Sequence, residues 1–229
     1  MKNAIPTTGA GGAGGVAADG SEGVAARIAQ RTAATRGPDY AAEVRRLLDA
    51  GLQVMTACGT TSRPRVADIV AAAGLSNDAF YRHFSSKDAL VAALLEDGSE
   101  RLASYLAHQM HKARTPQGEV RRWVEGILSQ AGDADVAAST LAVLWNAGSV
   151  GDGLDSGRPS STAPLAALVR EPLARLGSRD PDLDASLAAH AVVGRLSDLL
   201  WQRAQPTRAE VDHLVSFCVA AVAPTEEPR

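Results

Sequence analysis

Residues 66–84 read VADIVAAAGLSNDAFYRHF, and this stretch is the most informative part of the sequence. Apolar side chains recur at helical spacing through its first half, which predicts a short helix with one buried face. Gly74 can adopt the positive φ of a tight turn, and Ser76 can cap a second short helix behind it. The stretch is typical of two helices joined by a tight turn, with Pro64 in the first turn of the leading helix.

The second helix of this pair is expected to expose a polar face. In a helix-turn-helix motif such a face enters the major groove, where Asn reads adenine, Arg reads guanine and flanking groups contact phosphates. A helical hairpin in an ordinary packing domain is the alternative, and the density of polar side chains disfavours it. The polar face consists of Asn77, Asp78, Tyr81, Arg82 and His83.

The rest of the chain also predicts helices. Aromatic residues make up only 4% of the sequence, so the core must be built from Ala, Leu and Val, which favours packed helices over a β-sandwich. One helix begins at Asp39 and ends before Gly59, and another is capped by Ser85 or Ser86 and runs as far as Lys112. We therefore expect an all-α fold, with further helices near 117–131, 134–148, 162–177, 181–204 and 207–223.

Three regions are expected along the chain. Residues 1–35 are rich in Gly and Ala and predict a disordered tail, either a linker or an arm that contacts DNA. Residues 36–90 are expected to form a domain that contains the helix-turn-helix, with the motif itself at about 65–84, and residues 91–229 are expected to form a second helical domain. The stretch at 149–163 predicts a loop that either gates a pocket or connects two helices.

Charge and composition exclude several classes of protein. The net charge of −3 excludes a uniformly basic nucleic-acid coat protein, but residues 36–95 hold seven basic and six acidic side chains and leave room for a local basic face. Two cysteines provide neither a disulfide framework nor a cysteine zinc site, and His108 and His111 lack further metal ligands nearby. No nucleophile motif, phosphate loop or carboxylate pair indicates an enzyme, and no cofactor is expected. Without a signal peptide or an apolar run of ~20 residues, we expect a cytoplasmic protein with no membrane contact.

Several pieces of sequence, in order and in register from Tyr40 to Leu95, resemble the DNA-binding domain of the TetR (tetracycline repressor) family of bacterial regulators. They are Asp68-Ile69, Ala72-Ala73-Gly74-Leu75-Ser76, Phe80-Tyr81-Arg82-His83-Phe84 and Ser86-Lys87-Asp88-Ala89-Leu90.

This resemblance implies a homodimer that binds a palindromic operator and most often represses transcription. It also implies that residues 36–90 are the DNA-binding domain and residues 91–229 the ligand-binding and dimerisation domain. A small, largely apolar effector of unknown identity is then expected to release the DNA. A helical small-molecule carrier or enzyme with a vestigial helix-turn-helix is the alternative from another class, and a constitutive regulator without an effector is a third possibility.

The resemblance also implies which residues contact DNA. Members usually carry an uncharged residue in place of Asp78, so its carboxylate is expected either to accept from a cytosine amino group or to pair with Arg82. A Ser/Thr pair common at the start of the leading helix is replaced by Pro64-Arg65, which shifts the hydroxyl contacts towards the preceding loop. The expected DNA-binding residues are Thr61, Ser62, Arg65, Ser76, Asn77, Asp78, Tyr81, Arg82, His83 and Lys87, of which Tyr81, His83 and Lys87 contact phosphates.

Two further sites are expected in the C-terminal half. The residues that could line an effector pocket are Tyr105, Met110, Trp123, Trp145 and His190. The last two helices carry apolar stripes that serve either packing within the chain or, as the resemblance implies, pairing with a second copy across a two-fold axis. That dimer interface is expected to include Leu187, Ala191, Gly194, Trp201, Leu214 and Cys218.

Overall fold

A computed structural model of the chain describes residues 39–147, 162–220 and 222. The expected tail at 1–35 and residues 149–161 of the expected loop lie outside the described residues. Over the described ranges the chain contains helices and no strand, which confirms the all-α prediction. The helices are α2 (Asp39–Cys58), α3 (Val66–Ala73), α4 (Asn77–His83), α5 (Lys87–Met110), α6 (Pro116–Leu128), the 3₁₀ turn η1 (Ser129–Ala131), α7 (Ala134–Ala147), α8 (Ala163–Arg175), α9 (Pro181–Gln202) and α10 (Arg208–Ala220).

Local signals explain most helix boundaries. Ser76 Oγ accepts a hydrogen bond from the Ala79 N–H at 3.1 Å and starts α4, and Ser86 does the same for α5 through the Ala89 N–H. The cap of α5 is thus Ser86 rather than Ser85. The prediction for Pro64 is wrong: this residue is buried ahead of α3, and Arg65 is the N-cap.

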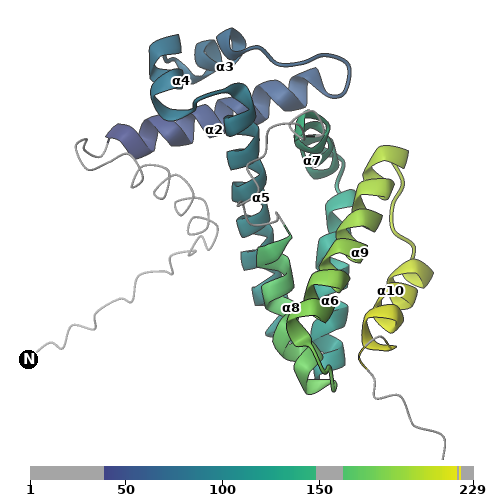
Figure 1. The fold of residues 1–229 in the computed structure, drawn as a ribbon. Helices are drawn as coiled ribbons and strands as arrows, with labels where there is room; N and C mark the ends of the chain where they lie inside the picture. Colours follow the sequence, from purple (N-terminus) through teal and green to yellow (C-terminus); the bar gives the residue numbers. More distant parts are fainter. Residues whose placement is uncertain (1–38, 148–161, 221, 223–229) are drawn as a thin grey trace, which may run out of the picture.

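The helices form two packed units that share α5 (Figure 1). In the first unit α2, α3, α4 and the start of α5 enclose a core that includes Phe80 and Ile69, both without exposed surface. In the second unit the end of α5 packs with α6, α8, α9 and α10 around Trp123. The boundary expected at residue 90 falls inside α5, where Val91 and Leu94 still belong to the first core.

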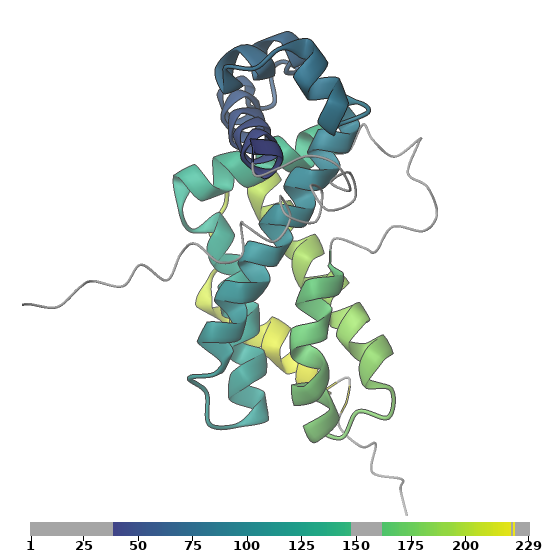
Figure 2. The ribbon, with the colours of Figure 1, turned by 90° about the vertical axis from the view of Figure 1, so that its left-hand side faces the viewer.

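Helix α7 links the two units. It crosses beneath α2, and its buried Ala142 and Val143 belong to the core of the first unit, whereas Leu141 and Leu144 pack against the second. Figure 2 shows α7 lying between the α2–α4 end and the long helices of the second unit. None of the helices in the described ranges is both long and apolar enough to cross a membrane.

Candidate nucleic-acid interface

The turn between α3 and α4 is fixed from both sides. Gly74 takes φ 62° and ψ 39°, a left-handed conformation that glycine adopts without a steric cost, and the Leu75 N–H donates to the Val70 carbonyl at 2.9 Å. Arg46 on α2 holds the same turn: its Nε and Nη2 donate to the Ala73 carbonyl at 3.0 and 2.6 Å, and Nη2 also donates to the Gly74 carbonyl at 3.0 Å. The angle between α3 and α4 is therefore set by α2 as well as by the turn.

Helix α4 buries one face and exposes the other. Ala79 and Phe80 are buried against α2 and α3, which leaves the opposite face of this seven-residue helix in solvent. Tyr81 is 59% exposed, and its neighbours on that face are exposed as well. The exposed set is Asn77, Asp78, Tyr81 and Arg82.

His83 does not lie on this exposed face, although the resemblance implied a phosphate contact for it. Its side chain has no exposed surface, because residue 83 follows Ala79 by four positions and Phe80 by three and thus shares their buried face. The ring packs on Tyr40 with the two centroids 4.1 Å apart, and its Nε2 lies 2.7 Å from Glu43 Oε2.

Glu43 on α2 also binds the adjacent arginine of α4. Arg82 Nη2 donates to Glu43 Oε2 at 3.1 Å, so the expected alternative pair between Arg82 and Asp78 is not formed. The hydrogen bond from His83 and the nearby positive charge of Arg82 hold the pKa of Glu43 below its usual 4.5. Sequence reasoning missed both Glu43 and Arg46, since their spacing from α4 along the chain reveals no contact.

The loop before α3 extends the exposed surface. Thr61 Oγ1 donates to the Cys58 carbonyl at 2.9 Å, and Ser62 and Arg65 are exposed. Arg65 binds Asp68 through two hydrogen bonds of 3.0 and 3.1 Å, and the bond from Arg65 lowers the pKa of the Asp68 carboxyl. Lys87, at the start of α5, is half-buried beside this surface.

Arg63 in this loop contacts α7, the helix that links the two units. The guanidinium carbon of Arg63 lies 5.9 Å from the centroid of the Trp145 ring, within the range of a cation–π interaction. Trp145 belongs to α7, so the loop that leads into α3 touches the helix that links the two units.

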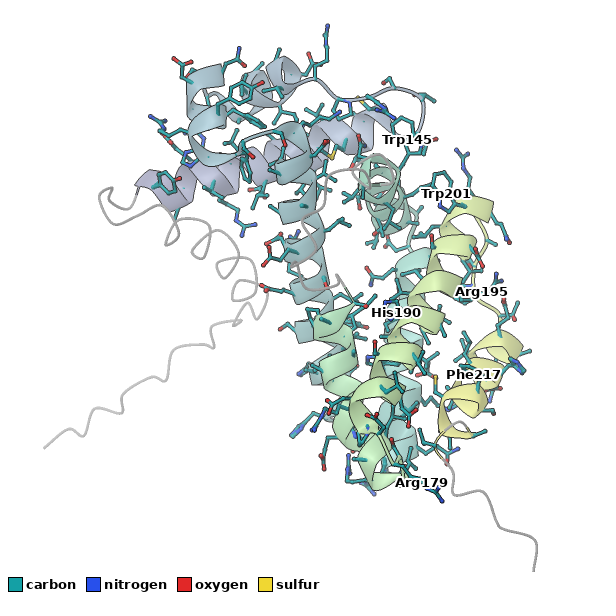
Figure 3. All side chains as sticks on the ribbon, viewed as in Figure 1. Trp145, Arg179, His190, Arg195, Trp201 and Phe217 are labelled. Carbon is teal, nitrogen blue, oxygen red and sulfur yellow. The ribbon has the colours of Figure 1, made fainter. Side chains whose placement is uncertain are left out.

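The five residues expected to line an effector pocket do not converge. Trp123 fills the core of the second unit and donates from Nε1 to the Leu165 carbonyl at 3.0 Å, and Met110 is buried in the same core. Tyr105 and His190 are exposed, and Trp145 lies on α7, apart from His190 on α9 (Figure 3). The structure therefore does not bring these five side chains together, and the hydrogen bond of Trp123 is typical of a buried tryptophan in a packed core.

The outer faces of α9 and α10 carry exposed apolar side chains. Leu187 and Trp201 are 58% and 51% exposed, Gly194 is exposed, and Ala191 and Leu214 are half-buried. Cys218, which was expected at the dimer interface, is buried and faces the chain's own core. Burial raises the pKa of its thiol to about 11. Phe217, one residue earlier and 51% exposed, occupies the outer face in its place (Figure 3).

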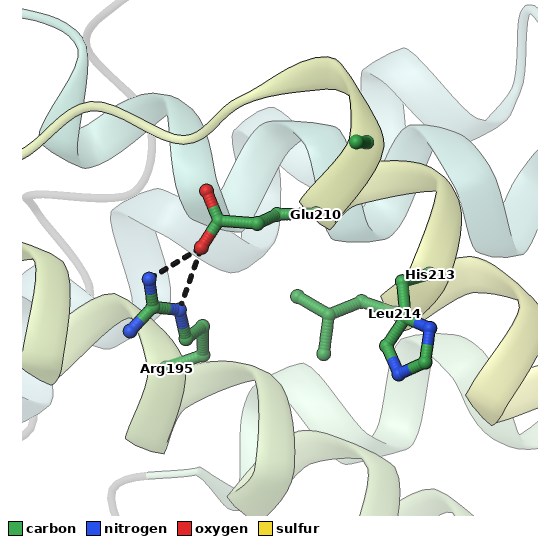
Figure 4. Close-up of a pocket in the computed structure, with 5 residues that line it drawn as sticks. Arg195, Glu210, His213 and Leu214 are labelled. Atoms are coloured by element: carbon green, nitrogen blue, oxygen red, sulfur yellow. Dashed lines mark hydrogen bonds and ion pairs between the residues drawn. The ribbon is translucent and has the colours of Figure 1, made fainter.

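A cavity of about 390 Å³ lies between α9 and α10 on the same side of the molecule, lined by Arg195, Glu210, His213, Leu214 and Ala209 (Figure 4). Arg195 Nε donates to Glu210 Oε1 at 3.1 Å. Hydrogen bonds from the Thr207 backbone, Arg195 and the Thr207 hydroxyl lower the pKa of Glu210 to about 2. This ion pair ties the start of α10 to α9.

Comparison with known proteins supports this arrangement. Residues 47–94 match the profile of bacterial regulatory proteins of the tetR family, a range that contains α3, α4 and the turn between them. No curated protein matches the sequence.

Solved structures share the fold of the chain. A TetR-family transcriptional regulator from Mesorhizobium loti is 15% identical with a TM-score of 0.56, and the match covers 80% of this chain and 95% of that one. A TetR-type regulator from Streptomyces avermitilis is 24% identical with a TM-score of 0.54, covering 79% and 97%. The fatty acid degradation regulator FadR from Bacillus halodurans is 19% identical with a TM-score of 0.50, covering 85% and 100%. The region that holds the helix-turn-helix is thus similar to the tetR family of bacterial regulatory proteins, and the described helices share the fold of the solved regulators.

Proposed function

We propose that the chain is a ligand-responsive transcriptional repressor that binds operator DNA as a homodimer and releases it when a small effector binds. The observation that carries this proposal is the exposed polar face of α4, which α2 and Gly74 hold outward in a fixed orientation. A rigid short helix with Asn, Tyr and Arg on its outer face fits the major groove, because side chains from such a helix reach base edges. We infer that the protein acts in the cytoplasm and has no enzymatic activity of its own.

The DNA contacts divide between two kinds. We propose that Asn77 and Arg82, both exposed, read base edges and that Tyr81 and Lys87 contact phosphates. Arg63 joins the phosphate-binding group, since it is exposed in the loop that leads into α3. The proposed set is Thr61, Ser62, Arg63, Arg65, Ser76, Asn77, Asp78, Tyr81, Arg82 and Lys87.

Two copies are needed to reach two half-sites. One turn of duplex separates neighbouring major-groove half-sites by about 34 Å, and a two-fold dimer presents two α4 helices at such a spacing. The exposed Leu187, Trp201 and Phe217 on α9 and α10 supply an apolar surface for this pairing.

The test is a gel-shift and footprinting experiment with intergenic DNA from around the protein's own gene, at low salt. We expect a protected palindrome with the wild-type chain. Arg82→Ala should relax the sequence preference at one base-pair position. Tyr81→Phe should lower the affinity for all DNA sequences alike. Arg179→Ala is the matched control, because this exposed arginine lies at the opposite end of the molecule from α4 (Figure 3). If the wild type binds no fragment, or if both α4 variants bind as the control does, the assignment of α4 as the recognition helix is wrong.

A further inference from the structure

A cleft of about 360 Å³ opens where the two units meet, outside the core that sequence reasoning expected to hold an effector. Its floor is formed by the ends of α2 and α9 together with η1 and α7. The volume falls within the roughly 300–1,000 Å³ of small-molecule sites. Its walls are mainly small apolar side chains, which include Ala137, Ala138 and Leu141 on α7 and Leu199 and Leu200 on α9.

The cleft is lined by one arginine among its described residues, Arg203. Arg203, the residue that ends α9, lines the cleft and is exposed, and its side chain makes no hydrogen bond or ion pair within the described ranges of the chain. The other arginines of α9 and α8 are neutralised: Arg195 binds Glu210, Arg170 binds Asp182 and Arg175 binds Glu119. An unpaired guanidinium beside an apolar wall is complementary to an anion with an apolar body.

The backbone of Arg203 fixes its position at the edge of the cleft, where it forms the C-cap of α9. It takes φ 51° and ψ 37°, and it is the one non-glycine residue with a positive φ within the parts of the chain that the structure describes. This position after a helix usually carries glycine, and a residue with a Cβ costs about 1 kcal/mol there. The cap is closed by the Ala204 N–H, which donates to the Leu199 carbonyl at 2.9 Å, so the place of Arg203 beside the cleft is set by the end of α9.

We propose that this cleft is the effector site and that it binds a small monocarboxylate, whose carboxylate pairs with Arg203 and whose apolar body packs on α7 and α9. This inference rests on the proposed function, since it names the ligand class and the place of the response. Thr60 adds a hydroxyl near the mouth, on the side of the cleft formed by the end of α2.

The position of the cleft explains how a ligand changes DNA binding. Thr56, Gly59 and Thr60 line it, and they lead directly into the loop that carries Arg63 and then into α3. Arg63 in turn contacts Trp145 on α7, the opposite wall. A ligand between α2 and α7 therefore contacts both units at once, and its binding free energy depends on how α2 and α7 are spaced.

The experiment measures ligand binding and DNA binding separately on the full chain. Octanoate is the probe, octanol is its neutral control of equal length, and binding is followed by isothermal titration calorimetry. We expect octanoate to bind more tightly than octanol. Arg203→Gln should lower the affinity for octanoate by about tenfold or more, because a charge-assisted hydrogen bond is lost. Ala138→Phe, which fills the cleft from the exposed side of α7, should abolish binding. Arg179→Gln is the matched control and should bind octanoate as the wild type does.

Fluorescence anisotropy with operator DNA then reports the response. Octanoate should lower the DNA affinity of the wild type and of Arg179→Gln, but not that of Arg203→Gln, which should still bind DNA without ligand. Failure of octanoate to bind the wild type, or equal binding by Arg203→Gln, overturns the site while DNA binding stands. Saturable, Arg203-dependent octanoate binding by a chain that binds no DNA supports the site and overturns the proposed function instead.

Discussion

Arg82 Nη2 on α4 lies 3.1 Å from Glu43 Oε2 on α2, and the same oxygen lies 2.7 Å from His83 Nε2. A single carboxylate of the first unit thus positions two consecutive side chains of the recognition helix. Arg82 remains 42% exposed, so it can reach DNA only by leaving or sharing this carboxylate. Glu43 thus stabilises α4, and if Arg82 binds DNA as proposed, Glu43 competes with the DNA for it.

Glu43→Gln should reveal both effects. The folded-state pKa of Glu43 lies below 4.5, so its contribution to stability is fully present above pH 4.5 and is lost as the pH falls through the folded-state value. At pH 7 the substitution should lower the free energy of unfolding in urea by about 1 kcal/mol, and the difference from wild type should vanish in acid. At low salt the variant should bind DNA more tightly per folded molecule, because one negative charge beside the duplex is removed. A pH-independent stability difference would contradict the role given to the Glu43 charge.

Arg46 should matter for both stability and DNA binding. Its three hydrogen bonds to the carbonyls of Ala73 and Gly74 use the planar fork of the guanidinium, which lysine cannot reproduce. We expect Arg46→Lys to lower the free energy of unfolding by roughly 1–2 kcal/mol and to weaken operator binding, as measured by thermal denaturation and anisotropy. Arg179→Lys should change neither quantity. An Arg46→Lys variant with wild-type DNA affinity would show that the turn between α3 and α4 holds its angle without α2.

The proposed phosphate contacts should appear in the salt dependence of binding. Each phosphate contact that is lost should reduce the slope of log K against log salt by about 0.9 per subunit, with little change in sequence preference. We expect this for Arg63→Gln and for Lys87→Gln, measured by anisotropy across a salt series. Unchanged slopes would place both cations away from the DNA backbone.

The sequence predicted the elements near α4 well because local signals determine them. Gly74, Ser76 and Ser86 each act within three or four residues, through a backbone conformation or a cap. The structure places the polar face of α4 outward, as its spacing predicts, with the exception of His83, which is polar but shares the face of Phe80. A histidine in a polar cluster was expected to be exposed. Its position on the helix and its contact with Glu43 instead bury its side chain.

The second unit was less predictable, because its sites depend on which helices meet. Cys218 and Phe217 are adjacent in sequence, and only the packing of α10 against the core shows which of them faces outward. Trp123 and Tyr105 were grouped as aromatic pocket residues, but one is fully buried and the other is 46% exposed. Arg203 carried no sequence signal, since its backbone conformation and its lack of an acidic neighbour emerge only from the fold.

The apolar face of α9 and α10 should control oligomeric state. Trp201→Ser combined with Phe217→Ser removes two exposed aromatic side chains without touching the core of the chain. We expect the double variant to be a folded monomer by light scattering. Its DNA affinity should fall by at least about tenfold, because a monomer contacts one half-site of the operator instead of two. Val136→Ser, at an exposed position on α7, is the control and should remain a dimer. A double variant that stays dimeric would place the interface elsewhere.

Arg203→Gly separates stability from ligand response. Glycine removes the Cβ penalty at φ 51°, so the variant should gain up to about 1 kcal/mol in the free energy of unfolding, reduced by the larger entropy that glycine has in the unfolded chain. The same substitution removes the one unpaired cation of the cleft, so octanoate should no longer lower DNA affinity. Urea denaturation and anisotropy with and without octanoate measure the two effects on one variant. Because the variant is expected to be at least as stable as the wild type, a lost response cannot arise from unfolding, and a retained response would show that Arg203 is not the group that binds the carboxylate.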